Sequence, residues 1–248
     1  MNLIRLMDNY FGNLFIGEKI GFTKVDSTWT SKSNEQMDRQ EWEDYRANED
    51  ITNKTPMQSW LSSLATREKR KFYIFDELLK ITEYSRILEL GAGQGHVGTM
   101  LNFAGRSTDL TEFHTGLLYT QIKDFNFTHF QMSFNDIDPT TLGKYDCVLA
   151  VQLDYMMDSA EIKLFLEKCA ASNTDVIFVN TQIIGPLNYW AYCFKQKSRL
   201  KVHKKHGFVR SLGFYRKVGK IAGFHTTVIR PKFGPINSYY FLKFTKNG

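Results

Sequence analysis

The sequence predicts an α/β protein with a doubly wound, mostly parallel seven-stranded sheet, preceded by an N-terminal helical or irregular cap. Short apolar segments alternate with helix-like segments from residue 85 onward, which is typical of a parallel sheet with helices on both faces. The last two predicted strands have no helix between them, so they should pair as an antiparallel hairpin at one edge. The chain has 248 residues, 42% of them hydrophobic, which is enough for one full core.

The N-terminal segment differs from the rest of the chain. Residues 1–56 are polar and irregular, and we expect them to form a cap or lid on a domain that spans residues 57–248. The first clear helix is expected from Thr55 to residue 81, because Thr55 can cap it and Pro56 suits its first position. A break in this helix is expected near the charged segment TREKRK.

The strands and helices of the main domain follow from apolar runs and from apolar residues at helical spacing. The predicted strands are residues 86–90, 106–110, 128–134, 145–153, 175–184, 225–233 and 238–246. The predicted helices are residues 96–104, 112–124, 159–172 and 211–224. The segment 185–210 is longer than most connections between such elements and is treated as an insertion.

The charge of the chain is unevenly distributed. Residues 185–248 contain 14 of the 32 Lys and Arg residues and no Asp or Glu. One interpretation is that this basic segment balances an acidic body. The other is that it forms a surface for an anionic partner, such as a phosphate, a nucleotide sugar, an acidic glycan, nucleic acid or lipid headgroups.

The cysteines and the N-terminus indicate a cytoplasmic protein. The three cysteines are too few and too scattered for a disulfide framework, and no CxxC motif or Cys/His cluster suggests a metal site. We expect reduced, mostly buried thiols. The first residues do not resemble a signal peptide, and no apolar run is long enough for a transmembrane segment.

The stretch RILELGAGQGHVGTML carries the strongest local signal. Gly91, Gly93 and Gly95 follow a short apolar strand that contains Glu89. Counted from Gly91, the third glycine of a dinucleotide motif would fall where the sequence has His. The Lys and Ser or Thr of a P-loop are also missing. Glu89 would repel a phosphate, whereas an acid suits a ligand that carries a cation.

The segment ELGAGQG resembles the first motif of the class I S-adenosylmethionine-dependent methyltransferases, E/D-x-G-x-G-x-G. The resemblance covers about residues 57–248 and implies a Rossmann-like fold. It also implies that S-adenosyl-L-methionine is the cofactor, bound at Glu89, Gly91, Gly93 and Gly95.

The same resemblance implies two further cofactor contacts. An acid is expected at the end of the second strand, and Asp109 is the predicted residue, with a helix N-cap as its other possible role. An adenine contact is expected after the third strand, where Asn135 and Asp136 are the best match and Phe134 is an alternative.

The fourth strand, in YDCVLAVQLDYMMD, resembles the fourth motif of the family. In this topology the reacting methyl group lies above the carboxyl end of that strand, which implies that Gln152, Asp154 and Tyr155 lie at the site. Gln152 is predicted to contact the cofactor and Tyr155 to contact the acceptor. Asp154 is the first candidate for a general base; a cap of the following helix is the alternative. The residues AVQLDY lack the Asn/Asp-Pro-Pro-aromatic signature of amino-methyltransferases, so methylation of a base nitrogen is less favoured.

In related enzymes an insertion after the fifth strand often forms the acceptor pocket. Aromatic residues there suit sugar rings or bases, basic residues suit anions, and histidines can serve as alternative bases. The residues predicted for these roles are Tyr189, Trp190, Lys204, Lys205, Arg210, His203 and His206.

These features together favour an O-methyltransferase. The predicted acceptor is a sugar-containing or phosphorylated molecule, such as a nucleotide sugar or a surface glycan. An RNA-directed methyltransferase that uses the same basic segment is one alternative. A methyltransferase-like scaffold subunit without catalytic activity is the other.

Overall fold

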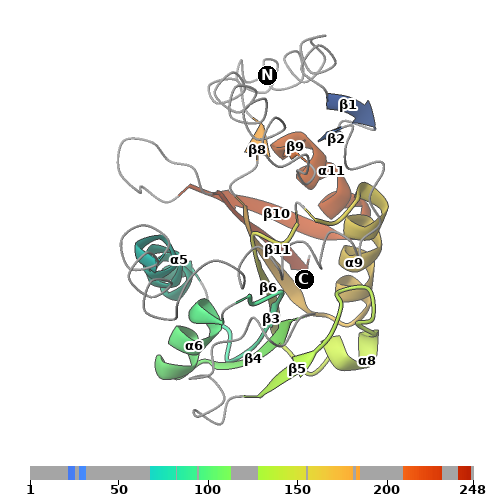
Figure 1. Cartoon of the computed structure of the whole chain (residues 1–248). Coiled ribbons are helices and arrows are strands. Elements are labelled where there is room, and N and C mark those ends of the chain that lie inside the picture. Colours follow the sequence, from blue (N-terminus) through green and yellow to red (C-terminus); the bar gives the residue numbers. More distant parts are fainter. Residues whose placement is uncertain are drawn as a thin grey trace.

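The computed structural model describes ten parts of the chain. These are residues 22–25, 28–31, 68–81, 83–93, 95–112, 128–154, 156–180, 183–184, 209–230 and 240–246. They form a large α/β unit and a small sheet (Figure 1).

The large sheet has seven strands in the order β10-β11-β7-β6-β3-β4-β5. The strands from β3 to β7 run parallel, and β11 is antiparallel to both of its neighbours, β7 and β10. The predicted sheet and its terminal hairpin are therefore confirmed. The strands are β3 (Arg86–Leu90), β4 (Ser107–Glu112), β5 (His129–Gln131), β6 (Cys147–Val151), β7 (Asp175–Asn180), β10 (Phe224–Ile229) and β11 (Tyr240–Lys246).

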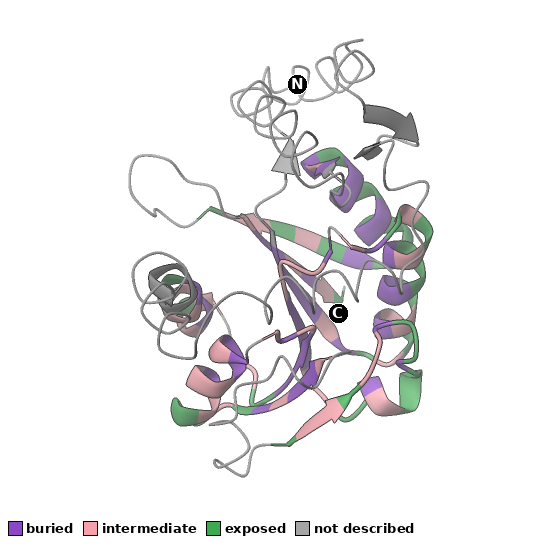
Figure 2. Ribbon diagram, in the orientation of Figure 1, coloured by how far each residue is buried: buried purple, intermediate pink, exposed green. Residues whose placement is uncertain are grey.

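Helices cover both faces of this sheet (Figure 1). One face carries α5 (Glu68–Ile81) and α6 (His96–Phe103), and the other carries α8 (Pro139–Leu142), α9 (Ser159–Ala171) and α11 (Leu212–Ile221). Since side chains alternate along a strand, Val148 joins the core beneath α9 and α11, whereas Leu149 joins the core beneath α5 and α6. Covering both faces explains why the central strands β3 and β6 are buried along nearly their whole length (Figure 2).

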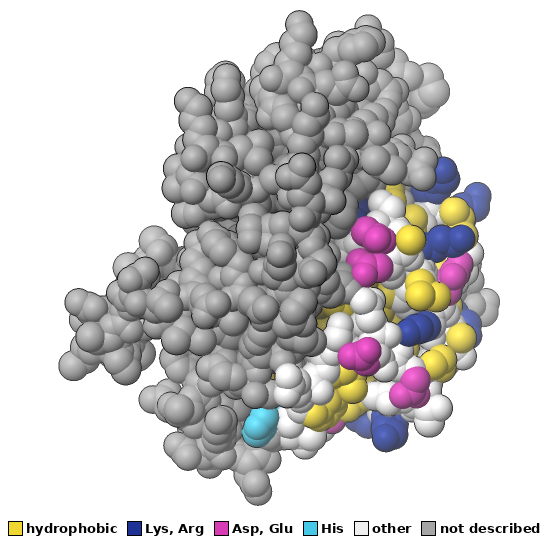
Figure 3. Space-filling model, turned by 45° about the vertical axis from the view of Figure 1, so that its right-hand side comes forward, with side chains coloured by type: hydrophobic (Ala, Val, Ile, Leu, Met, Phe, Trp, Pro, Cys, Tyr) yellow, Lys and Arg dark blue, Asp and Glu magenta, His cyan; other side chains and the backbone are white. Residues whose placement is uncertain are grey.

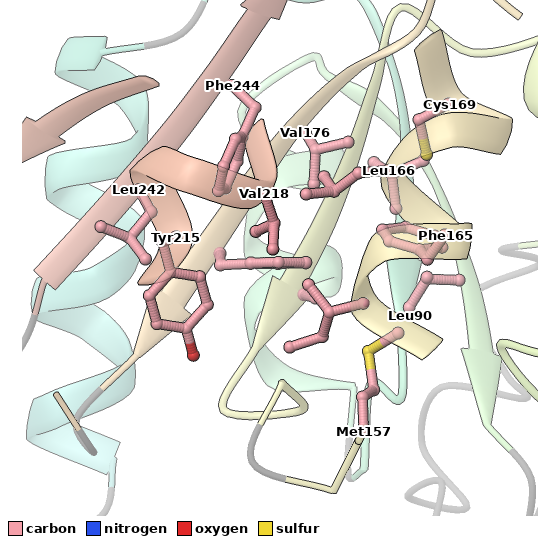
Figure 4. Packing of buried hydrophobic residues seen from close by; sticks show 14 of the residues in the cluster. Leu90, Met157, Phe165, Leu166, Cys169, Val176, Tyr215, Val218, Leu242 and Phe244 are labelled. Atoms are coloured by element: carbon pink, nitrogen blue, oxygen red, sulfur yellow. The ribbon is translucent and has the colours of Figure 1, made fainter. Parts of the chain in front are cut away.

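The larger of the two cores is rich in aromatic residues. The ring centroid of Phe178 in β7 lies 5.5 Å from that of Phe244 and 6.3 Å from that of Tyr215, both in edge-to-face geometry. Phe165 of α9 stacks on Phe178 with ring centroids 6.0 Å apart. These contacts join α9, α11, β7 and β11 into one packed layer (Figure 4).

Local sequence signals fix the starts of two helices. Asp158 caps α9, and its side chain and that of Glu161 form a capping box. Ser211 caps α11, where its hydroxyl accepts a hydrogen bond from the backbone amide of Phe214. The alternative prediction that Asp154 caps α9 is therefore wrong, because Asp158 occupies that position.

A second, smaller sheet has the strand order β1-β2-β9-β8. It joins a hairpin of the N-terminal segment, β1 (Phe22–Val25) and β2 (Thr28–Ser31), to β8 (Ile183–Ile184) and β9 (Val209–Ser211). The single strand predicted over residues 175–184 is too long, because β7 ends at Asn180 and the last two residues pair with β9. The N-terminal cap and the insertion predicted at 185–210 both contribute to this sheet.

The described cysteines match the prediction of reduced, buried thiols. Cys147 and Cys169 are free and fully enclosed. Burial raises the pKa of both thiols far above the ordinary value, so both stay protonated. Cys193 lies outside the described residues.

Among the described helices, none is both long and apolar enough to cross a membrane.

Two leucines of α9 test the packing. Leu166 has no exposed surface, whereas Leu164 on the same helix is 54% exposed. Leu166→Ala should lower the free energy of unfolding by about 2–5 kcal/mol, because it leaves a cavity in the core. Leu164→Ala should change it by at most about 0.5 kcal/mol. Urea denaturation measures both; equal losses would contradict the burial of this helix face.

Candidate cofactor site

The turn from β3 to α6 contains three glycines in the left-handed region. Their φ angles are 58° at Gly91, 58° at Gly93 and 73° at Gly95, a conformation that other residues adopt only with strain. A Cβ atom at Gly91 would lie 2.8 Å from Cδ1 of Leu153, so this glycine also permits close packing. A Cβ atom at Gly93 would meet nothing within 4 Å, so the space beside Gly93 is open to a ligand.

Glu89 connects this turn to the start of α6. Its side chain is only 2% exposed, and Oε2 accepts a hydrogen bond of 2.7 Å from the backbone amide of Gly98. The backbone oxygen of Glu89 also accepts a hydrogen bond from the Thr111 hydroxyl. These contacts give Glu89 a positioning role. Its predicted role as a direct cofactor ligand stays a prediction.

Gly98 is a functional position that the sequence analysis missed. A Cβ atom there would lie 2.1 Å from Cδ2 of Leu110 and 2.5 Å from Oε2 of Glu89, so α6 crosses β3 and β4 where only glycine fits. Counted from Gly93 rather than Gly91, the spacing GxGxxG is in fact present and ends at Gly98. The spacing argument against a dinucleotide was therefore wrong. The antiparallel β11 is the feature that departs from the dinucleotide-binding sheet.

The location predicted for Asp109 was wrong. Because Thr111 and Glu112 continue the pairing of β4, this strand ends at Glu112, and Asp109 lies opposite Leu88, about 10 Å before the carboxyl edge. The Asp109 carboxylate accepts a hydrogen bond of 2.6 Å from the hydroxyl of Tyr145. Burial and this hydrogen bond raise the pKa of Tyr145, which keeps the phenol protonated.

Glu112 occupies the place that the prediction gave to Asp109. Its Oε2 accepts a hydrogen bond of 2.6 Å from the backbone amide of Gly93, so the acid lies directly at the glycine turn. The backbone of the turn is also joined to β4, because the amide of Ala92 donates to the oxygen of Thr111. A signal was present in the sequence: Glu112 follows Gly93 by about 20 residues, the usual distance to a ribose-binding acid.

The turn after β5 is held against α9. The Nζ atom of Lys168 donates to the backbone oxygens of Asn135 and Ile137, at 3.1 Å and 2.9 Å. Asn135 and Asp136 are exposed there, and their adenine-binding role stays a prediction. The alternative adenine contact, Phe134, was wrong, because its ring is 7% exposed and belongs to the core.

Gln152 marks the carboxyl end of β6. It has a φ of 57°, which is rare for a residue other than glycine, and its backbone amide donates to the oxygen of Val179. Strained backbone of this kind gathers at functional sites. Its neighbour Leu153 packs against Gly91. The structure thus brings Gln152 to the same edge as the glycine turn, and its contact with the cofactor stays a prediction.

The structure gives Asp154 and Arg210 internal contacts instead of their predicted roles. Asp154 has no exposed surface, and its Oδ2 accepts a hydrogen bond from the hydroxyl of Tyr215. Arg210 is equally buried and donates to the backbone oxygens of Asp154 and Met157. Asp154 is therefore enclosed and hydrogen-bonded within the protein, which does not suit a general base, and Arg210 is not a surface contact for an anion. Both follow from the docking of β9 and α11 over this loop.

The other predicted residues lie outside the described part of the chain. They are the ones assigned to the acceptor, and they come mainly from the insertion: Tyr155, Tyr189, Trp190, His203, Lys204, Lys205 and His206.

Three strand ends thus meet at one edge of the sheet. Gly91 and Gly93 follow β3, Glu112 ends β4, and Gln152 follows β6. Ligands of doubly wound sheets bind at the carboxyl ends of the strands, where the order of connections reverses. This edge, with β3 between β4 and β6, has that topology.

Comparison with solved structures agrees with this topology. Magnesium protoporphyrin IX methyltransferase (ChlM) from Synechocystis PCC 6803, solved with bound SAH, superimposes with a TM-score of 0.58 at 13% identity. The match covers 85% of this chain and all of that one. The chain has the class I methyltransferase fold.

Other methyltransferase structures match over similar lengths. A putative O-methyltransferase from Nostoc punctiforme PCC 73102 has a TM-score of 0.58 and 14% identity, covering 98% of this chain and 70% of that one. The pyocyanin biosynthetic protein PhzM has a TM-score of 0.57 and 10% identity, and the match covers 86% of this chain and 62% of that one. No family model matches the sequence, and no curated protein matches it. At these identities the likeness establishes the fold alone.

Gly98 can be tested by substitution. Gly98→Ala should lower the free energy of unfolding by about 1–3 kcal/mol, because Leu110 and the Glu89 carboxylate are both buried and cannot move aside freely. Gly143→Ala is the control, since a Cβ atom there would lie 3.5 Å or more from its neighbours and φ is −63°. Urea denaturation of both variants gives the result. A Gly98→Ala protein as stable as the wild type would contradict the close crossing.

Proposed function

We propose that the protein is an S-adenosylmethionine-dependent methyltransferase. The observation that carries the proposal is the carboxyl edge of β3 and β4, where the open, left-handed Gly93 meets the Glu112 carboxylate through its backbone amide. When bound, the cofactor supplies an electrophilic methyl group on a sulfonium. The residues at this edge suit such a ligand, because an acid favours a cation and hydroxyl groups and disfavours a phosphate.

Each described residue at this edge would make a different contribution to cofactor binding. Glu112 would accept hydrogen bonds from the ribose hydroxyls, as an acid at the end of the second strand does in this fold. Gly91, Gly93 and Gly95 would let the backbone approach the ligand closely. Glu89 would act through Gly98, by holding α6 and hence the turn in place.

The proposed acceptor is anionic and is methylated on oxygen. Support comes from the segment 185–248, which contains no acidic residue. Arg216, Lys217 and Lys220 on α11 are exposed, and no described carboxylate lies within ion-pair distance of them. Figure 3 shows several Lys and Arg side chains at the upper right of this view, with acidic and hydrophobic side chains beside them. A sugar-containing or phosphorylated small molecule fits this chemistry.

The buried position of Asp154 changes the proposal for the base. A phosphate or carboxylate oxygen needs no general base, whereas a hydroxyl acceptor does. His203 and His206 remain the proposed bases for a hydroxyl acceptor, since a neutral imidazole can accept its proton. Positioning the acceptor and excluding water would then supply most of the rate enhancement.

Glu112 provides the sharpest test of the cofactor site. Glu112→Gln should weaken binding of S-adenosylhomocysteine by about 1.5–3 kcal/mol, because it removes a charge-assisted hydrogen bond. Asp109→Asn, in the same strand, should leave the affinity nearly unchanged, since Asp109 contacts Tyr145 away from the edge. Calorimetry measures both affinities. The reverse pattern would restore Asp109 as the ribose ligand, and tighter binding of NADH than of the methyl donor would reject the cofactor.

The acceptor class can be tested with a labelled methyl donor. Sugars, nucleotides, lipids and RNA are offered as separate groups, and transfer to a sugar or nucleotide is expected. The double variant Lys204→Glu, Lys205→Glu should then raise the acceptor KM, most strongly at low salt, because it adds repulsion to lost attraction. A lower melting temperature with an unchanged KM would show that the basic segment balances the acidic body. Transfer to RNA alone, with steep salt dependence, would identify a nucleic-acid substrate.

A further inference from the structure

The loop between β6 and α9 forms one wall of the candidate cofactor site. Gln152 begins the loop in the left-handed region, and its amide donates to the oxygen of Val179 at 2.8 Å. Leu153 packs so closely on Gly91 that any side chain there would collide with it. A change in this loop would therefore move the glycine turn or open a gap beside it.

Arg210, which is not part of the large sheet, donates two hydrogen bonds to this loop. Its Nη1 donates to the backbone oxygen of Asp154 at 2.8 Å, and its Nη2 donates to that of Met157. The guanidinium carbon lies 5.1 Å from the ring centroid of Phe214, and the side chain has no exposed surface. Because the donors of a guanidinium are held in a rigid plane, one side chain fixes the separation of two loop carbonyls.

Tyr215 closes the same network through a second contact. Its hydroxyl donates to Oδ2 of Asp154, and both side chains are buried. Burial, followed by the negative charge of Asp154, raises the pKa of Tyr215 well above its ordinary value, and Arg210 acts in the opposite direction. The phenol therefore stays protonated and remains a donor.

Arg210 and Tyr215, which hydrogen-bond to the loop, come from β9 and α11 and not from the strands that flank the loop. The backbone of Arg210 in β9 pairs with Thr28 of the N-terminal hairpin and with Ile183 of β8. Tyr215 is in α11, which begins directly after β9 (Figure 1). The loop itself begins where β6 of the large sheet ends. The network thus connects the small sheet to the carboxyl edge of the large one.

We propose that Arg210 and Tyr215 are positioning residues that hold residues 152–154 and 156–158, after β6, in the conformation that receives the cofactor. The small sheet places Arg210, so the pairing of β9 contributes to the geometry of a site on the other sheet. The effect on the cofactor rests on the function proposed above. The effect on the loop does not.

Tyr215→Phe in the full chain is the first test. The amides of Gln152 and Met156, which donate to Val179 and Leu153, should exchange with deuterium about tenfold faster once Asp154 loses its phenol donor. Binding of S-adenosylhomocysteine should weaken roughly tenfold. Tyr84→Phe is the matched control, since it also removes a hydrogen bond between a phenol and a carboxylate, 2.5 Å long to Asp175, at the amino end of the sheet. It should leave loop exchange and affinity unchanged.

Arg210→Lys is the second test, and it keeps the charge. An ammonium is a point donor and cannot hold two carbonyls at a fixed separation, so the same loop amides should exchange faster and the affinity should fall. Unchanged exchange and affinity in both variants would overturn the proposal. If the wild type itself does not bind S-adenosylhomocysteine, the proposed function fails. Loop exchange in Tyr215→Phe and Tyr84→Phe then still decides whether the network holds the loop.

Discussion

The candidate site depends on the buried hydrogen bond between the Glu89 carboxylate and the backbone amide of Gly98. It ties the first turn of α6 to β3, at a crossing where Leu110 of β4 leaves room only for glycine. Because β3 and α6 approach each other so closely, residues 91–95 between them must form a tight turn. They do so with three left-handed glycines, which place the Gly93 amide against Glu112.

The antiparallel strand β11 organises the other half of the molecule. This strand lies between β7 and β10. Its residue Phe244 lies in the core beneath α11 and packs edge-to-face against Phe178. Phe178 in turn contacts Tyr215, whose hydroxyl binds Asp154 in the loop after β6. The aromatic core and the wall of the site therefore share a side chain, and the packing of α11 affects both.

The basic C-terminal segment contains both enclosed and exposed charges in the described structure. Arg210 is buried against loop carbonyls, and Lys243 donates to the backbone oxygen of Ile81 and lies over the ring of Tyr84. These two charges stabilise the interior. Arg216, Lys217 and Lys220 face outward on α11. Neither interpretation of the charge asymmetry is decided by these contacts, because they join the two interior charges to backbone oxygens and a ring instead of acidic side chains.

The sequence alone determined the seven strands of the large sheet, the helices that follow β3, β6 and β9, the terminal hairpin and the glycine turn. It did not predict α8 or the small sheet, and the helix predicted over residues 112–124 lies almost wholly outside the described residues. The features that it determined depend on local patterns: continuous apolar strands, helical spacing, caps such as that of Ser211, and glycines that permit left-handed backbone. The distance from Gly93 favours Glu112 over Asp109 as the acid that ends β4, but the apolar pattern ends this strand at Leu110. The pairing of β4 with its neighbours extends it to Glu112.

Tertiary structure also decided which charges are buried. Asp154 and Arg210 both looked exposed in the sequence, since Asp and Arg are seldom buried unless they are paired. They become buried because β9 and α11, more than fifty residues away from the loop, dock over it and supply Arg210 and Tyr215. Gly98 completes a GxGxxG spacing in the sequence, but the reason why only glycine fits there is the close approach of α6 to Leu110 of β4. Burial and close approach depend on segments that are distant in the chain, and local patterns do not record them.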